Sequence, residues 1–398
     1  MTKQINVLSF SSDLHFGGDE NRILALAQSI DRSRFNHVVA TINRPDVELD
    51  QSFGTMRRQF ADAGIEVIDL GEVHSKAKPA IRPVQLARTT RVLSRVVKKL
   101  AALVQAHDID VIDAHTSANQ IGILAGVITR KPSVVTIYGH EQRLLPRLLS
   151  PVFLGMADAV VTDSHAICNR LKRWMIQPDL KTHVIPNGVS PPSSAHDRAE
   201  MMKKLGLPAD PNTQVIGQVS ALVPYKGHRV LLAAAKSVLE KAPNTAFLLV
   251  GYSRDAESYE KDLEKEIADM GMSDRIRLLN YPGYIGDVWN TIDIHVHASL
   301  MDSLPNAIIE SMSLAKPAVA TSVGGIEEMI EHERTGLIVP PGNPDALARA
   351  LLRLLREPEL AQRLGEAARN RYQERYRPEV MTRKLETLFT DLISRRQL

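Results

Sequence analysis

The stretch "LMDSLPNAIIESM", from Leu300 to Met312, holds two carboxylates with seven residues between them, Asp302 and Glu310. Asp302 precedes Pro305 and has the surroundings of a loop residue, whereas Glu310 lies about one turn into an apolar pattern of helical period. Such a pair could accept hydrogen bonds from the hydroxyl groups of a ribose or a sugar. The alternative is a surface helix with a capping carboxylate.

Backbone N–H groups near these carboxylates could bind an anion. Pro305 stiffens the turn, so Leu304 and Asn306 can offer their N–H groups, and the helix that follows adds the positive end of its dipole. In "SSDLHFGGDE", Gly17 and Gly18 stand between a strand pattern and a helix pattern. Paired glycines there let N–H groups turn towards a phosphate, although a tight turn would explain them equally well.

A lysine at the start of a helix is the third candidate. In "VPYKGH", Lys226 and Gly227 could hold a diphosphate by charge and backbone donors, or the lysine could simply be solvated. The segment "TSVGGIEE" repeats the strand–glycine–helix arrangement at Gly324 and Gly325. The chain has neither a GxxxxGK[ST] loop nor a GxGxxG fingerprint, which disfavours a nicotinamide oxidoreductase.

The elements that must position these residues are short β-branched runs that alternate with helical patterns along the whole chain. This alternation predicts parallel sheets covered by helices on both faces. The stretch "NGVSPPSSAHD", residues 187–197, is the best boundary. We therefore expect an α/β protein of two Rossmann-like, doubly wound domains, residues 1–190 and 191–375, with a cleft between them. Ligands of such domains bind at the carboxyl ends of the strands.

The C-terminal part of the chain reads as helix. Asn343 is expected to cap a helix that begins at Pro344. The last segment, residues 376–398, carries an apolar stripe and is expected to return to the first domain. The residues of that stripe are Val380, Met381, Leu385, Leu388, Phe389 and Leu392.

Composition sets the remaining bounds. The chain of 398 residues is 44% hydrophobic and 24% charged, and its net charge of +3 is too small to argue for nucleic acid. The single cysteine, Cys168, rules out an internal disulfide and fits a reducing compartment. The N-terminus does not read as a signal peptide and no apolar run is long enough to cross a membrane, so we expect a cytoplasmic protein.

One segment is markedly basic. Residues 73–107 contain no acidic residue, and an apolar stripe runs beside the positive charges, so this helix could dock weakly on the inner face of an anionic membrane. The alternative is an ordinary amphipathic helix with a solvated basic face. The basic residues are Lys76, Lys78, Arg82, Arg88, Arg91, Arg95, Lys98 and Lys99.

Two patterns resemble metal sites without completing one. His295 and His297 in "IHVHAS" would share one face of a strand, but two ligands do not make a site, and packing within the strand is the better explanation. The "DID" at residues 108–110 comes just before a buried strand and is better explained as its polar lead-in.

Taken together, these motifs resemble the family-4 retaining glycosyltransferases of GT-B architecture, over nearly the whole chain. The first half supplies "FGGDE", "AHTSA" and "VVTIYGH", and the junction supplies "VIPNGV". The second half supplies "KGH", "FLLVG", "DSLPNAIIESM", "PAVATSVGGIEE" and "TGLIVPPGN". The most specific element is the pair of acidic residues separated by seven.

The resemblance implies a role for each matching residue. Lys226 would bind the donor diphosphate, Glu310 the ribose, and Asp302 the transferred sugar. The residues implied in catalysis are Asp302, Glu310, Lys226, His115 and His140. Those implied in binding the donor are Gly17, Gly18, Lys226, Ser303, Leu304, Pro305, Asn306 and Glu310.

The chain departs from the family pattern at several positions. Asp302 stands where Glu is usual, Ser303 where Gly is usual, and Ala221 where an Arg commonly partners the lysine. Arg229 or Arg254 could substitute for that arginine. Tyr138 takes the place of a frequent sugar-contacting histidine, a role that His115 or His140 could fill. These differences leave the donor open.

The implied function is transfer, with retention, of a sugar from a nucleotide-diphosphate donor to a glycan or lipid-linked acceptor in cell-surface polysaccharide or lipopolysaccharide synthesis. A UDP-sugar is the favoured donor and GDP-mannose the next. No cofactor and no metal are expected. A nucleotide-sugar epimerase on the same fold and a non-catalytic nucleotide-sugar-binding protein are the alternatives.

Overall fold

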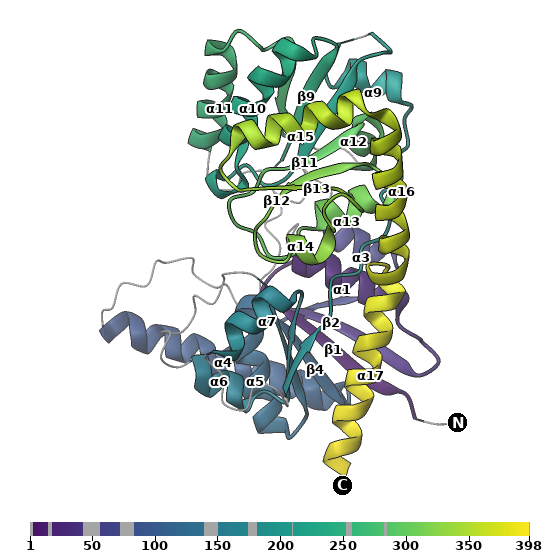
Figure 1. Cartoon of the computed structure of the whole chain (residues 1–398). Helices are drawn as coiled ribbons and strands as arrows, with labels where there is room; N and C mark the ends of the chain where they lie inside the picture. The colour runs from purple at the N-terminus through teal and green to yellow at the C-terminus, as the bar shows by residue number, and fades with distance from the viewer. Residues whose placement is uncertain are drawn as a thin grey trace. The chain divides into compact units, whose positions relative to one another are not determined.

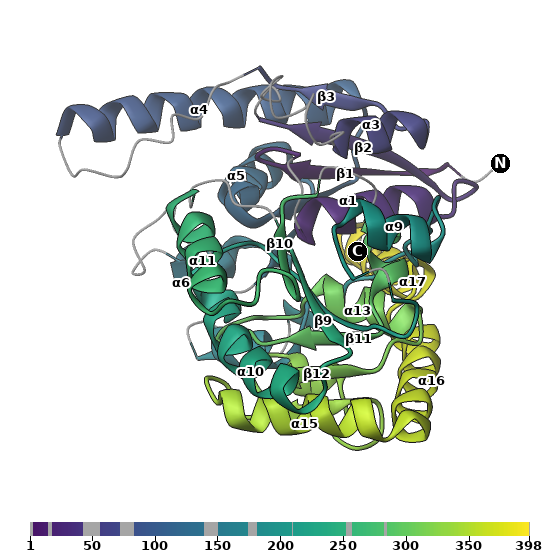
Figure 2. The ribbon, with the colours of Figure 1, turned by 90° about the horizontal axis from the view of Figure 1, so that it is seen from above.

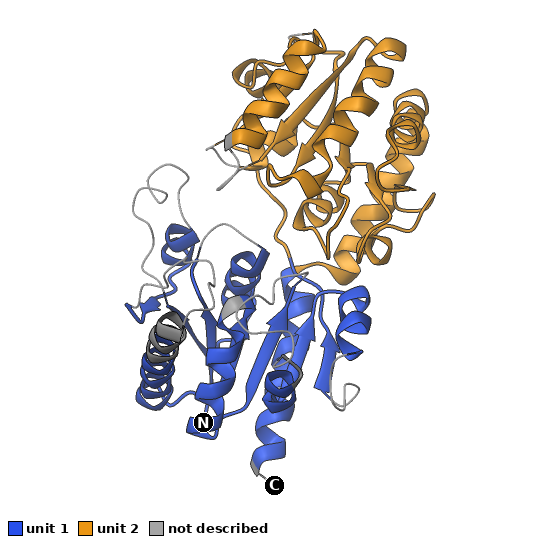
Figure 3. Ribbon diagram, turned by 90° about the vertical axis from the view of Figure 1, so that its left-hand side faces the viewer, with its two compact units in different colours: residues 1–188, 378–398 blue, residues 189–377 orange. Residues whose placement is uncertain are grey.

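The computed structural model contains two compact α/β units, residues 1–188 together with 378–398 and residues 189–377 (Figures 1 to 3). These bounds lie within a few residues of the expected ones. The structure describes residues 3–14, 18–42, 56–71, 83–138, 150–173, 181–208, 210–251, 257–281 and 285–397.

Unit 1 is built on a parallel sheet of seven strands in the order β3-β2-β1-β4-β5-β6-β7. Strands β4, β5 and β6 are buried throughout, as expected for strands covered on both faces. The strands are β1 (Ile5–Ser11), β2 (Phe35–Thr41), β3 (Val67–Asp69), β4 (Val111–His115), β5 (Ser133–Ile137), β6 (Ala159–Thr162) and β7 (Thr182–Val184).

Alternate residues of these strands face two different helical layers. Val7 and Val111 belong to a cluster with α1 (Gly18–Ser29) and the last helix, α17 (Pro378–Gln397). Leu8 and Ile112 point the other way, towards α4 (Pro83–Ala106) and α5 (Asn119–Thr129). The shorter elements of this unit are α3 (Met56–Asp62), η1 (Thr116–Ala118), α6 (Ser150–Met156) and α7 (His165–Lys172).

Unit 2 has a parallel sheet of six strands in the order β10-β9-β8-β11-β12-β13. One face packs on α10, α11 and α15, and the other on α9, α12, α13 and α16. The strands are β8 (Gln214–Val219), β9 (Thr245–Val250), β10 (Ile276–Leu279), β11 (Ile294–His297), β12 (Ala318–Thr321) and β13 (Leu337–Val339). The helices are α9 (Arg198–Lys204), η2 (Pro224–Lys226), α10 (His228–Lys241), α11 (Glu257–Asp269), α12 (Ile285–Thr291), α13 (Asn306–Ser313), α14 (Ile326–Met329), α15 (Pro344–Arg356) and α16 (Pro358–Arg375).

The strand order changes direction once in each sheet. In unit 1 this point lies between β1 and β4, and in unit 2 between β8 and β11. The loops that leave neighbouring strands at such a point diverge to opposite faces of the sheet, which opens a crevice at the carboxyl ends of the strands. Lys226 follows β8, and Asp302 and Glu310 follow β11.

Two expectations about the C-terminal helices are confirmed. The Asn343 side chain accepts a hydrogen bond from the N–H of Ala346, and Pro344 begins α15. The apolar stripe of α17 packs in the core of unit 1, with Met381, Leu385 and Phe389 almost completely buried. Among the described residues, no helix has the length and apolar content that crossing a bilayer would require.

Candidate active site

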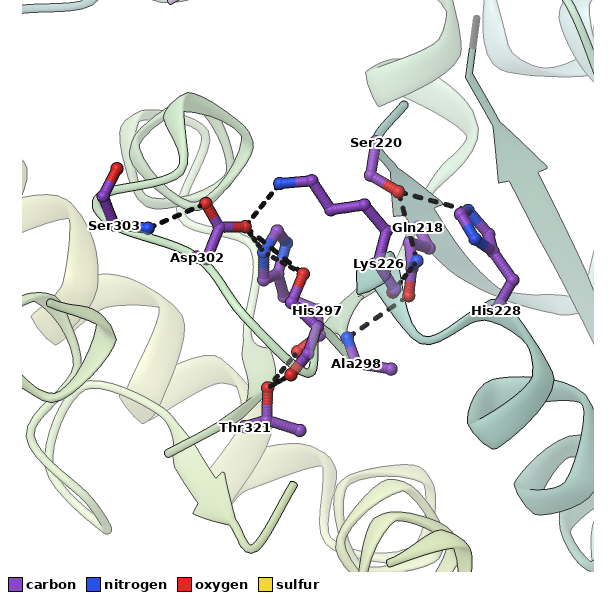
Figure 4. A network of polar contacts seen from close by, with 10 residues as sticks. Gln218, Ser220, Lys226, His228, His297, Ala298, Asp302, Ser303 and Thr321 are labelled. Atoms are coloured by element: carbon purple, nitrogen blue, oxygen red, sulfur yellow. Dashed lines mark hydrogen bonds and ion pairs between the residues drawn. The ribbon is translucent and has the colours of Figure 1, made fainter. Parts of the chain in front are cut away.

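A lysine and an aspartate meet at the carboxyl ends of β8 and β11. Lys226 ends the short turn η2 after β8, and Asp302 lies in the loop after β11. Lys226 Nζ is 2.5 Å from Asp302 Oδ2 (Figure 4), and the two side chains are only 15% and 10% exposed. The ion pair is thus formed where water screens it weakly, which strengthens the attraction.

Asp302 is also held by His297 at the end of β11 and by two neighbours on its own loop. His297 Nε2 lies 2.8 Å and Ser299 Oγ 3.2 Å from the same oxygen, Oδ2, while the N–H of Ser303 donates to Oδ1. Burial acts to raise the pKa of Asp302, but the hydrogen bonds and charges of His297 and Lys226 outweigh it and hold that pKa well below its usual range. Asp302 is therefore a fixed anion.

His297 donates to this anion as a neutral ring. Its side chain is 2% exposed, and burial lowers its pKa even though Asp302 acts in the opposite direction. A neutral imidazole has one N–H, so the contact with Asp302 places the proton on Nε2. Nδ1 is buried and has no hydrogen-bond partner within the described part of the chain.

The position of Lys226 is fixed by a glutamine and a glycine. Gln218 on β8 donates to the carbonyl oxygen of Lys226 at 2.9 Å and accepts from the N–H of Ala298 at 3.2 Å, so it ties η2 to the end of β11 (Figure 4). Gly227 has φ of 73°, and a Cβ added there would lie 1.9 Å from the carbonyl oxygen of Ala298. Only glycine fits both constraints, which explains the "KG" pair.

The glycine pair at the end of β12 supports the Asp302 loop. Gly324 has φ of 56°, and a Cβ there would lie 1.9 Å from the carbonyl oxygen of Asp302. The N–H of Gly325 donates to the carbonyl oxygen of Ser303 at 2.7 Å. The arrangement that resembled an anion site in the sequence thus packs against the backbone that carries Asp302.

The second carboxylate lies on α13. Pro305 is the N-cap of this helix, Asn306 is its first residue, and Leu304 is buried in the core beneath. The N-terminus of α13 carries the positive end of the helix dipole, which favours an anion nearby. Glu310 Oε2 accepts a hydrogen bond of 2.8 Å from the indole N–H of Trp289, and burial raises the Glu310 pKa, with this hydrogen bond opposing the rise.

A second polar cluster lies in unit 1, at the ends of β4 and β5. His115 Nε2 is 3.0 Å from Asp113 Oδ2, and both side chains are completely buried. Tyr138 Oη is 3.4 Å from His115 Nδ1. Burial raises the pKa of Tyr138 well above its usual value, so the phenol remains protonated. If Nε2 of His115 donates to Asp113, Nδ1 accepts the phenolic proton, which leaves the oxygen of Tyr138 to accept from a ligand.

The remaining predicted residues are spread between the two units. Gly18 is the first residue of α1 and is exposed. His140 and Gly17 lie outside the described residues, as does Arg254. Arg229 binds Glu266 at 2.7 Å and lies 3.6 Å from Asp262, which argues against its serving as the missing partner of Lys226.

Sequence reasoning missed four side chains of these clusters: Asp113, Gln218, Trp289 and the role of His297. Asp113 left a signal, because a carboxylate within the apolar strand "VIDAH" needs a buried partner. His297 was interpreted as strand packing, which its burial supports, but its contact with Asp302 depends on a loop five residues away. In the described part of the chain, no three metal-ligating side chains form a group.

Comparison with known proteins identifies this arrangement. Residues 16–191 match the family "Glycosyltransferase Family 4", and residues 197–371 match "Glycosyl transferases group 1". The chain belongs to the family-4 glycosyltransferases, and it is an enzyme of the sugar-transferring class.

Individual relatives agree with this assignment. An alpha-D-kanosaminyltransferase of Streptomyces kanamyceticus is 27% identical over 293 residues, which is 69% of this chain and 73% of that enzyme. A UDP-Gal:alpha-D-GlcNAc-diphosphoundecaprenol alpha-1,3-galactosyltransferase of Escherichia coli is 26% identical over 258 residues, 60% of this chain and 65% of the relative. The crystal structure of Anabaena HepE in complex with UDP and glucose superposes with a TM-score of 0.79 at 22% identity, covering 97% of this chain and all of that one. The fold is GT-B.

Proposed function

We propose that the enzyme transfers a sugar, with retention of anomeric configuration and without a metal ion, from a nucleotide-diphosphate donor held by unit 2. The observation that carries this proposal is the placement of Lys226, Asp302 and Glu310 around the carboxyl ends of β8 and β11. Lys226 and the N-terminus of α13 bind the diphosphate, and Glu310 accepts hydrogen bonds from the ribose hydroxyls.

The reaction builds negative charge on the leaving diphosphate and positive charge at the anomeric carbon. Lys226 stabilises the leaving group because it is already oriented before the reaction begins, and such preorganised charge is worth far more in a dry site than in water. The acceptor hydroxyl attacks the anomeric carbon from the side of the departing diphosphate. Its proton passes to a phosphate oxygen of the donor as the sugar–phosphate bond breaks.

The state of Asp302 supports a route without a protein nucleophile. Its reactive oxygen Oδ2 already accepts from Lys226, His297 and Ser299, and its low pKa makes it a weak nucleophile. A glycosidase-like carboxylate must be free to attack the anomeric carbon. Asp302 instead keeps Lys226 in place and leaves part of Oδ1 to accept from a hydroxyl of the transferred sugar.

A UDP-sugar is the proposed donor, with GDP-mannose as the next candidate. HepE, which shares the fold, binds UDP and glucose, and the Escherichia coli relative is named for UDP-Gal. That relative acts on a diphosphoundecaprenol-linked sugar, which supports a glycan or lipid-linked acceptor in cell-surface polysaccharide or lipopolysaccharide synthesis.

A thermal-shift screen against UDP-, GDP- and ADP-sugars tests the donor, because a bound ligand raises apparent stability by mass action. We expect UDP-sugars to raise the Tm most. Transfer is then followed by NMR of the product's anomeric proton, with and without EDTA. An inverted anomer or loss of activity in EDTA contradicts the proposed mechanism, and turnover of the donor without an acceptor would show an epimerase instead.

One surface of unit 1 has the charge and the apolar side chains that would suit a membrane carrying a lipid-linked acceptor. Arg95 and Lys98 are exposed on α4, and α5, which packs beside α4, exposes the apolar side chains of Val127 and Ile128. Val152 and Met156 are exposed on α6 nearby. We propose that this surface docks weakly on an anionic membrane, since positive charge beside apolar side chains suits such lipids.

Vesicle sedimentation tests the membrane contact. We expect binding to anionic liposomes at low salt, weakened by Arg95→Glu/Lys98→Glu and by Val127→Ser/Ile128→Ser. Arg58→Glu is the matched control, because Arg58 is an exposed arginine on α3, on the other side of the sheet. Sedimentation that is absent in the wild type, or equal in all variants, refutes the contact.

A further inference from the structure

The carboxylate of Glu310 is bound from outside its own helix. The indole N–H of Trp289 on α12 donates to Glu310 Oε2 at 2.8 Å. Within the described residues no other side chain donates to this carboxylate. An indole nitrogen is a donor only, so when it is buried it needs an acceptor. Each of the two groups therefore satisfies the other.

The side chain of Trp289 is buried and closely packed. It is 0% exposed and lies in a cluster with Val288 of α12, with Ile292 just after that helix, and with residues of strands β8 and β9. The ring of His295 on β11 contacts it edge-on, with centroids 5.1 Å apart. Burial holds the pKa of His295 well below its usual value, so this neighbour is neutral. The indole N–H is thus a rigid donor that fixes the plane of the carboxylate.

Two opposing effects act on the charge of Glu310. Burial raises its pKa, because the ionised form loses water, while the indole N–H lowers it by binding the ionised form. The carboxylate must be ionised to accept hydrogen bonds from two ribose hydroxyls. A fixed donor on Oε2 favours that form and leaves Oε1 directed away from the indole.

We propose that Trp289 is a positioning residue for the donor nucleotide: it orients Glu310 and favours its ionised form, so that the other carboxylate oxygen accepts from the ribose. This inference rests on the proposed role of Glu310. Because the Trp289 side chain is completely buried, we expect it to act on the nucleotide only through Glu310.

The coupling can be measured without any substrate. The chain has two tryptophans, Trp174 and Trp289, so a Trp174→Phe protein reports on Trp289 alone. We expect its fluorescence to show a transition as the pH falls through the raised pKa of Glu310, and we expect Glu310→Gln to abolish that transition. Fluorescence that is flat, or that changes equally in Glu310→Gln, overturns the coupling.

The contribution to binding is measured with Trp289→Phe, which retains an aromatic ring and removes the donor. Because a hydrogen bond to a charged group is lost, we expect the KM for the donor to rise by about tenfold with a smaller change in kcat. The acid limb of kcat/KM should shift to higher pH. His295→Phe, which retains the edge contact and the indole N–H, should leave that limb in place.

Glu310→Gln separates the two ideas. If Trp289→Phe raises the KM in the wild type but not in the Glu310→Gln background, the effect passes through Glu310 as proposed. If it raises the KM equally in both, Trp289 acts by packing alone and the inference is wrong. If Glu310→Gln binds the donor as tightly as the wild type does, the proposed role of Glu310 fails, and with it the inference, even where the fluorescence coupling is present.

Discussion

Lys226 Nζ and Asp302 Oδ2 lie 2.5 Å apart, so the lysine has an anionic partner within the protein. A diphosphate must share or replace that partner. Coulomb attraction at a partly buried site makes this exchange sensitive to charge. We therefore expect the pair to set both the position of Lys226 and the affinity for the proposed diphosphate donor.

Removing the two partners should have opposite effects on nucleotide binding. We expect Lys226→Ala to weaken UDP binding by roughly 10- to 100-fold, since charge-assisted hydrogen bonds are lost. Asp302→Asn should bind UDP at least as tightly as the wild type, because a negative charge beside the diphosphate is gone, while transfer falls. Isothermal titration with UDP checks both.

The matched control is Lys265→Ala, which breaks an exposed lysine–aspartate pair with Asp269 on α11. It should change neither UDP binding nor transfer. Equal UDP affinity in Lys226→Ala and in this control would refute the role of Lys226.

Gly227 should tolerate no side chain. Gly227→Ala combines strain at φ of 73° with a Cβ 1.9 Å from a carbonyl oxygen, whereas Gly271→Ala has φ of 67° and nothing within 4 Å. We expect Gly271→Ala to cost about 1 kcal/mol of unfolding free energy, from backbone strain alone. Gly227→Ala should cost clearly more and should also weaken UDP binding. Urea unfolding and titration of both variants measure the difference, and equal losses would contradict the close contact.

Stability should fall in mild acid because buried histidines resist protonation. Burial lowers the pKa of His228 to about 4, against about 6.5 when the chain is unfolded. Between these values the unfolded chain binds the extra proton, so stability is lost as the pH falls from 6.5 towards 4. At pH 5 this one residue should cost about 2 kcal/mol relative to pH 8. His228→Gln should lose correspondingly less stability over that range, and an unchanged pH profile would argue against the neutral buried ring.

Tyr138 should affect transfer more than donor binding, because it lies in unit 1 while the proposed donor residues lie in unit 2. Tyr138→Phe removes the oxygen that His115 orients, so we expect kcat to fall roughly tenfold with little change in UDP affinity. Asp113→Asn should produce a similar loss by releasing the ring of His115. Loss of UDP binding in either variant would contradict this division of roles.

The sequence predicted the architecture well because its signals are local. The predicted alternation is found among the described residues as two parallel sheets of seven and six strands, since each strand is a short run of β-branched residues next to a helical pattern. The cap at Asn343 and the stripe of α17 also depend only on spacing along the chain. The need for glycine at positions 227 and 324 could not be predicted, because nothing in "KG" or "GG" shows that the backbone of Ala298 or Asp302 lies against them.

The polar clusters depend on contacts between distant segments. Gln218 and Ala298 are 80 residues apart, and Lys226 and Asp302 are 76 apart, so no periodic pattern joins them. In the sequence, Trp289 resembled an ordinary core residue, and only its indole nitrogen, which donates to Glu310, sets it apart. Its hydrogen bond to Glu310 depends on how α12 and α13 pack side by side on one face of the sheet, and no local sequence pattern predicts that packing.

The return of α17 has a consequence for how the enzyme is made. Unit 1 contains residues 1–188 and 378–398, and Met381, Leu385 and Phe389 fill its core beside strands that come much earlier in the chain, such as β1 at Ile5–Ser11. A ribosome therefore delivers every residue of unit 2 before it delivers the last helix of unit 1. A premature stop near Arg377 would leave all residues of unit 2 in place but expose the hydrophobic core of unit 1. We therefore expect chaperones to bind the nascent N-terminal half until α17 has been synthesised.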